Sequence, residues 1–173
     1  MKRRKFLKAG GGIGLAALAG AGVLFARGTK RVALPTEALQ FFSEREYSIF
    51  HAVAETVLVL PAKAPSADQM KVTLLADRHL ARLDEDAQRD FHRLLGLFDN
   101  ALAGLLLTGT TAPFTQLAPE KRHAFLKKWE MHRIGALRSG YQALKRLACA
   151  CYYGNRETYA ALGYAGPPDK DPE

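Results

Sequence analysis

The stretch Ser43-Glu44-Arg45-Glu46-Tyr47-Ser48-Ile49-Phe50-His51-Ala52-Val53-Ala54-Glu55-Thr56-Val57-Leu58 contains both a helix start signal and a helical repeat. Its first four residues have the spacing of a capping box, with Ser at the cap and Glu three positions later. Apolar residues then recur at intervals of three and four from Tyr47 to Leu58, which predicts one amphipathic helix. Because Pro61 cannot continue a helix, we expect this helix to run to about Leu60.

Two further helices are predicted next along the chain. Ser66 and Gln69 repeat the capping-box spacing and predict a helix that runs through Leu83. Acidic residues 84–86 suit the start of another helix, where the helix dipole favours negative charge. An apolar stripe continues from there to Leu106, so we expect a single long helix that ends near Gly109.

The C-terminal half predicts three more helical segments. Pro119 suits a first helical turn, because its missing N–H has no intrahelical partner there. That helix is interrupted at residues 132–135, another covers 136–153, and Asn155 caps a short one ending near Leu162. The prediction is an all-α fold, a compact bundle of five or six helices preceded by an N-terminal export leader helix. The expected boundaries are residues 1–31 for a leader or membrane anchor, 32–42 for a linker, 43–166 for the helical domain and 167–173 for a flexible tail.

The first 26 residues have the composition of an export leader. Residues 1–8 read Met-Lys-Arg-Arg-Lys-Phe-Leu-Lys, and an uncharged run from Ala9 to Ala26 follows. The adjacent arginines resemble the twin-arginine leader R-R-x-F-L-K, which carries proteins that are already folded. The targeting residues on this interpretation are Arg3, Arg4, Phe6 and Leu7. We therefore expect a periplasmic protein exported by the twin-arginine translocase.

Two other interpretations of this segment stay open, an ordinary Sec signal and a retained anchor in the inner membrane. Arg27, Lys30 and Arg31 lie just beyond the apolar run and disfavour Sec export. The run of 18 uncharged residues is just long enough to span a bilayer if it is not cleaved. More basic residues precede the run than follow it, which favours a cytoplasmic N-terminus.

The charge of the chain is concentrated in this leader. Residues 1–31 hold eight of the 25 Lys and Arg and no acidic residue, so the remaining 17 basic residues balance all 17 Asp and Glu. The rest of the chain is therefore neutral. A neutral domain lacks the basic footprint of a nucleic-acid-binding protein, and we expect no nucleic-acid partner.

Catalytic and metal-binding motifs are absent from the sequence. It contains no G-x-S-x-G, no H-E-x-x-H and no phosphate-binding loop. His79 and His92, with Asp77 and Asp90, would form a metal site if two helices faced each other, but we expect them to lie on solvated helix faces. We predict no catalytic residue, no metal and no cofactor bound by this chain.

Two cysteines and a group of aromatic residues lie near the C-terminus. Cys149 and Cys151 are two positions apart, so on a helix they point in nearly opposite directions and do not bond each other. One buried and one incidental thiol is the expected arrangement, and a disulfide to another chain is the alternative. Core packing accounts for Trp129 and Tyr141. The candidate partner-binding residues are Trp129, Tyr152, Tyr153, Tyr164 and Pro167, since exposed aromatic rings suit contact surfaces.

Residues 152–167, Tyr-Tyr-Gly-Asn-Arg-Glu-Thr-Tyr-Ala-Ala-Leu-Gly-Tyr-Ala-Gly-Pro, resemble the C-terminal signature of the gluconate 2-dehydrogenase subunit 3 family. Tyr159 stands where many relatives carry Trp, and a looser similarity extends through residues 43–61. The resemblance implies a noncatalytic small subunit that binds a large FAD-containing subunit of the glucose-methanol-choline type, and escorts it through the twin-arginine translocase. A cytochrome c subunit is a further implied partner. The alternative function is an independent, membrane-tethered periplasmic helical module.

Overall fold

Helices and short connections make up the computed structural model, which describes residues 30–166 apart from the side chains of Leu102 and Leu107. Its α-helices are α2 (Glu44–Val57), α3 (Val72–Leu80), α4 (Glu85–Phe98), α5 (Ala101–Thr108), α6 (Pro119–Glu130), α7 (Gly135–Tyr153) and α8 (Tyr159–Leu162), with 3-10 turns η1 (Phe114–Gln116) and η2 (Arg156–Thr158). No strand occurs between residues 30 and 166, and the predicted all-α fold is confirmed. The expected leader helix lies outside the described residues.

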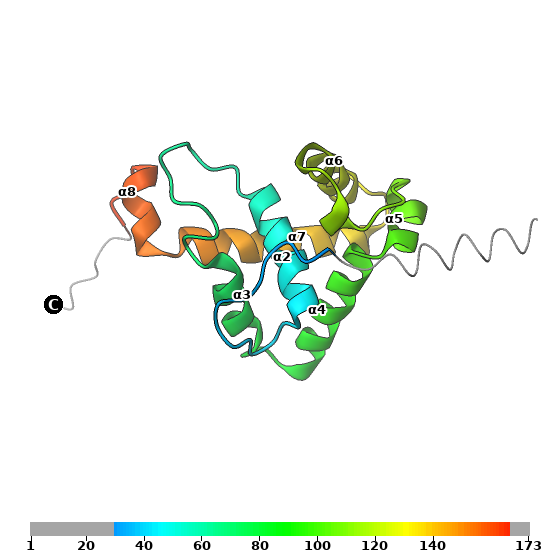
Figure 1. Cartoon of the computed structure of the whole chain (residues 1–173), viewed down its shortest axis with the longest axis horizontal. Helices are drawn as coiled ribbons and strands as arrows, with labels where there is room; N and C mark the ends of the chain where they lie inside the picture. The colour runs from blue at the N-terminus through cyan, green and yellow to red at the C-terminus, as the bar shows by residue number, and fades with distance from the viewer. Residues whose placement is uncertain (1–29, 167–173) are drawn as a thin grey trace, which may run out of the picture.

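Helix α2 lies in the middle of the bundle and contacts α3, α4, α6 and α7. Its Ile49, Phe50 and Val53 are completely buried, as the repeat of three and four predicts. The longest helix between residues 30 and 166, α7, packs on α2, α3 and α6 and runs along the length of the described bundle. Helix α8 lies at one end of α7, whereas α5 and α6 lie towards the other end (Figure 1).

An aromatic cluster fills the core between α4, η1 and α6. The ring centroid of Phe98 lies 4.7 Å from that of Trp129 and 4.8 Å from that of Phe114, and Phe125 completes the group. Each of these side chains is at least 98% buried. Burial of one such ring stabilises the fold by about 1.5–3 kcal/mol, so this cluster fixes η1 against the two helices.

The single long helix predicted from residue 84 to Gly109 is wrong, because the chain breaks at Asp99 and Asn100 into α4 and α5. The buried Asp99 carboxylate accepts hydrogen bonds from the N–H and the hydroxyl of Thr115, at 2.8 and 2.9 Å. The side-chain carbonyl of Asn100 accepts from the N–H of Ala103 and so caps α5. A continuous helix would lose both arrangements.

Two other predicted helix boundaries are shifted. Ser66 and Gln69 do exchange the two capping-box hydrogen bonds, at 2.8 and 3.1 Å, but they close only a turn. Lys71 then adopts a left-handed conformation with φ of 50°, and α3 begins at Val72. The opening helix α2 ends at Val57 rather than near Leu60, because the chain is already extended at Leu58.

Candidate functional site

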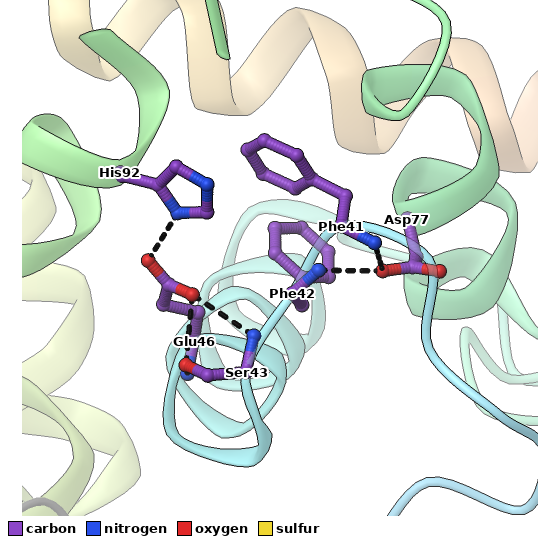
Figure 2. Close-up of polar contacts among 6 residues, drawn as sticks. All are labelled: Phe41, Phe42, Ser43, Glu46, Asp77 and His92. Atoms are coloured by element: carbon purple, nitrogen blue, oxygen red, sulfur yellow. Dashed lines mark hydrogen bonds and ion pairs between the residues drawn. The ribbon is translucent and has the colours of Figure 1, made fainter. Parts of the chain in front are cut away.

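Residues 30–42, here called the N-terminal strap, precede the helical bundle and are held along its surface without regular secondary structure. The main anchor is Asp77 on α3, whose side chain is buried. Its Oδ1 accepts hydrogen bonds from the N–H groups of Phe41 and Phe42, at 2.9 and 2.7 Å, and Oδ2 accepts from the N–H of Gln40 at 2.7 Å. Figure 2 shows this carboxylate beside the strap.

The strap ends in the capping box of α2, which is also tied to α4. Oε2 of Glu46 accepts hydrogen bonds from the N–H and the hydroxyl of Ser43, at 2.9 and 2.7 Å. Its other oxygen lies 2.6 Å from Nδ1 of His92, which donates because an ionised carboxylate only accepts. The His92 ring stacks on Phe41 with centroids 4.2 Å apart (Figure 2). The Glu46 carboxylate thus joins α2 to α4, and His92 in turn contacts the strap through Phe41.

The beginning of the strap is anchored on η1. The N–H of Lys30 donates to Oγ1 of Thr115 at 3.1 Å, and the same hydroxyl donates to Asp99. The hydroxyl of Ser48 donates to the carbonyl of Ala33 at 2.9 Å. The strap is therefore held at both ends and near its middle.

Charged side chains reinforce the strap on the α3 side. Glu37 pairs with Lys71 at 2.9 Å and also with Arg78. The hydrogen bond from Lys71 and its charge, with a smaller contribution from Arg78, lower the pKa of the Glu37 carboxyl. These side chains are largely exposed, so the two ion pairs orient the strap more than they stabilise the fold.

A groove of about 570 Å³ lies between α3 and the end of α7. Arg78, His79 and Arg82 line it from one side, and Cys151 and Asn155 line it from the other. Burial raises the pKa of the Cys151 thiol to about 11. At neutral pH this thiol is protonated and is therefore a weak nucleophile.

A protein-family model described as gluconate 2-dehydrogenase subunit 3 matches residues 44–166. The chain belongs to this family. The match begins at the first residue of α2, directly after the Ser43 cap, and ends at the last described residue, Gly166. No curated protein and no solved structure matches the chain.

Membership of the gluconate 2-dehydrogenase subunit 3 family makes the chain a subunit of a dehydrogenase complex, with a dehydrogenase as its partner. The family description also fits an accessory subunit rather than a separate enzyme. None of the helices between residues 30 and 166 is long and apolar enough to cross a membrane.

The structure divides the residues predicted to bind a partner into two groups. Trp129 and Tyr152 are buried in the core, and the Tyr152 hydroxyl donates to the carbonyl of Pro65 at 2.6 Å. The core interpretation of Trp129 is therefore confirmed, whereas the partner-binding prediction is wrong for both residues, since their side chains are not available to a partner. Tyr153 and Tyr164 are 42% and 51% exposed at the α8 end of the subunit. Pro167 and the targeting residues Arg3, Arg4, Phe6 and Leu7 lie outside the described residues.

The two cysteines of the subunit 3 chain are both free and half-buried on α7. Burial raises the pKa of the Cys149 thiol as well as that of Cys151. The expected arrangement of one buried and one incidental thiol is therefore replaced by two half-buried thiols. A disulfide from either residue to another subunit remains a prediction.

Asp77 was expected on a solvated helix face, and the structure shows that this is wrong. The side chain is 1% exposed and binds the strap. His92 contacts Glu46, whereas His79 lines the groove beside α7, so the two histidines do not form one cluster. Within residues 30–166 no group of three His, Cys, Asp or Glu is arranged to hold a metal ion. The sequence predicted one part of this arrangement, the capping box of Ser43 and Glu46 at the end of the strap.

Proposed function

We propose that this chain is the noncatalytic small subunit of a periplasmic FAD-dependent dehydrogenase of the glucose-methanol-choline type. It binds the large FAD-containing subunit in the cytoplasm and escorts it through the twin-arginine translocase. The observation that carries the proposal is the family match over residues 44–166, which covers nearly all of the described chain. A cytochrome c subunit is the proposed electron acceptor.

The leader and the strap support the escort role. Arg3 and Arg4, with Phe6 and Leu7, supply the pattern that the translocase would read. The strap then connects this leader to the folded bundle through Asp77 on α3 and Thr115 on η1. Because those two anchors are 38 positions apart in sequence, they hold the strap only when the bundle has folded. This suits a route that carries folded cargo.

The test is a pull-down of the tagged chain from periplasm and membranes of cells that also express the large subunit. We expect a large co-eluting chain with a flavin absorption spectrum, identified by mass. The double variant Arg3→Lys and Arg4→Lys keeps the charge and should remove both chains from the periplasm. Arg27→Lys, outside the pair, is the matched control and should leave export unchanged.

Two results would contradict the proposal. Elution of the chain alone and colourless would favour an independent membrane-tethered module. Unchanged export of the double variant would rule out the twin-arginine route. Binding of the large subunit is judged separately, from the chains that co-elute in the same pull-down. The N-terminal sequence of the exported chain shows whether the leader is removed or retained as an anchor.

A further inference from the structure

Exposed apolar side chains gather where α4 ends, along α5 and at the turn between α6 and α7. We call this surface the apolar end. Its residues are Leu97, Leu105, Leu106, Met131 and Ile134. Leu106 and Met131 are 77% and 71% exposed, which is unusual for side chains of this size. No charged residue occurs between Asp99 and Glu120, so α5 and its following loop offer only apolar and neutral polar groups to a ligand.

Hydrogen bonds join these segments into one region. The Lys128 ammonium on α6 donates to the carbonyl of Thr108 at the end of α5, at 2.6 Å. Met131 lies three residues beyond Lys128, one helical turn away. Leu97 lies two residues before Asp99, which binds Thr115 on η1. Figure 1 shows α5 and α6 together at the end of the molecule opposite α8.

The leader joins the bundle in this same region. The N–H of Lys30 is bonded to Thr115, whose own N–H is bonded to Asp99 at the α4–α5 junction. Only residues 27–29 separate Lys30 from the uncharged run that ends at Ala26. Four Cα steps span at most about 14 Å, and α5, with eight residues, is about 12 Å long. The chain length from Lys30 to Ala26 is therefore sufficient to reach the apolar end.

We propose that the uncharged run of the leader, residues 9–26, packs against the apolar end in the precursor. The leader run is uncharged, and the five residues that define the apolar end are apolar, with the charged Lys128 and Arg138 beside them. Association of the two removes Leu106 and Met131 from water together with the leader's own Leu and Val side chains. The strap makes this association intramolecular, so a high effective concentration favours it over binding to another molecule. The apolar end thus shields the leader until another binding partner takes it. This inference needs only the leader and the bundle, and it stands apart from the dehydrogenase partner.

Disulfide trapping in the purified full-length precursor tests the contact. The starting chain carries Cys149→Ser and Cys151→Ser, and Leu18→Cys is placed in the leader. It is combined with Leu106→Cys at the apolar end or, as the control, with Tyr164→Cys, which is exposed at the α8 end. We expect the Leu106 pair to form an intramolecular disulfide about tenfold faster than the Tyr164 pair. Circular dichroism confirms that each variant folds.

A second variant shows whether the faster disulfide formation depends on apolar packing or only on the short chain segment between the leader and the bundle. Met131→Glu places a charge within the apolar end and should reduce trapping of the Leu106 pair to the rate of the control pair. Equal trapping of the two pairs from the start would overturn the proposal. Trapping that is unaffected by Met131→Glu, or disulfides mainly between two copies of the chain, would also overturn it. The isolated precursor is used, so none of these outcomes depends on the dehydrogenase subunit or on export.

Discussion

Replacing Asp77 by Asn should loosen the N-terminal strap while leaving the shape of the side chain unchanged. The native carboxylate accepts three backbone hydrogen bonds, two at Oδ1 and one at Oδ2. An amide offers one oxygen and one NH₂ group, so at least one strap N–H loses its acceptor and faces another donor. A hydrogen bond to a charged group contributes roughly 1.5–3 kcal/mol. We therefore expect Asp77→Asn to lower the free energy of unfolding by about 2 kcal/mol.

Asp77→Ala should have a larger effect, because all three N–H groups lose their acceptor. The N–H of Phe42 is buried, whereas those of Gln40 and Phe41 are partly open to water and can be hydrated. The expected loss is about 4 kcal/mol, below the simple sum of three bonds. Urea denaturation followed by circular dichroism measures both values. Limited trypsin digestion reports on the strap itself, where Lys30 and Arg31 should be cut sooner in each variant.

Asp90→Asn is the matched control for this experiment. Asp90 lies on α4 with a largely exposed side chain that pairs with Arg93, three positions away. Its replacement should change the free energy of unfolding by less than about 0.5 kcal/mol. If Asp77→Asn is no more destabilising than Asp90→Asn, the three strap hydrogen bonds do not stabilise the fold and the anchor described for Asp77 is wrong.

Three further predictions concern local interactions. Asn100→Ala removes the cap of α5 and should cost about 1 kcal/mol, seen as a lower midpoint of urea denaturation. Hydrogen bonding from His51, followed by its charge and that of Arg122, lowers the pKa of Glu55 below 4.5. The stabilisation that the ionised Glu55 gives to the fold is present above pH 4.5 and is lost as the pH falls through the lowered pKa. Glu55→Gln should therefore make the free energy of unfolding depend less on pH in the acid range. Because burial raises the pKa of Cys151 to about 11, its alkylation in the Cys149→Ser variant should keep accelerating up to about pH 11; a plateau near pH 9 would show that the thiol is not desolvated.

Local signals in the sequence predicted the parts of the fold that local interactions determine. The Ser43 capping box, Pro119 at the start of α6 and Asn155 before η2 each act within a few residues, and each is present in the structure. The break between α4 and α5 depends on Thr115, which lies 16 residues from Asp99. An apolar stripe that is continuous in sequence gives no sign of such a distant partner, and this is why one long helix was predicted.

The same limit applies to the candidate site. Asp77 lies on a predicted helix whose sequence shows no nearby residue to bind it. Its three hydrogen-bond donors are backbone N–H groups 35–37 residues earlier. Every residue has backbone groups, so the sequence does not show which of them will bind a side chain. Asp77 was therefore predicted to be a solvent-exposed acidic residue. For a related reason Trp129 was given both a core and a partner-binding role, and Tyr152 only a partner-binding one. An aromatic residue suits both a core and an interface, and only the packing of neighbouring helices determines which role it has.

The strap anchors form only when the bundle has folded. Asp77, His92 and Thr115 belong to three separate elements, and all three contact the strap or its cap only after α3, α4 and η1 have packed together. In an unfolded chain residues 30–42 form a free segment, whereas in the folded bundle the N–H of Lys30 is bonded to Thr115. On the proposed escort function, Asp77→Ala should therefore reduce export of a bundle that is still folded, because the strap keeps its hydrogen bonds at Lys30 and Ala33 but loses those at residues 40–42. Export measured at a temperature where urea denaturation shows the variant to be folded tests this, and export equal to that of the Asp90→Asn control would show that the strap has no part in presenting the leader.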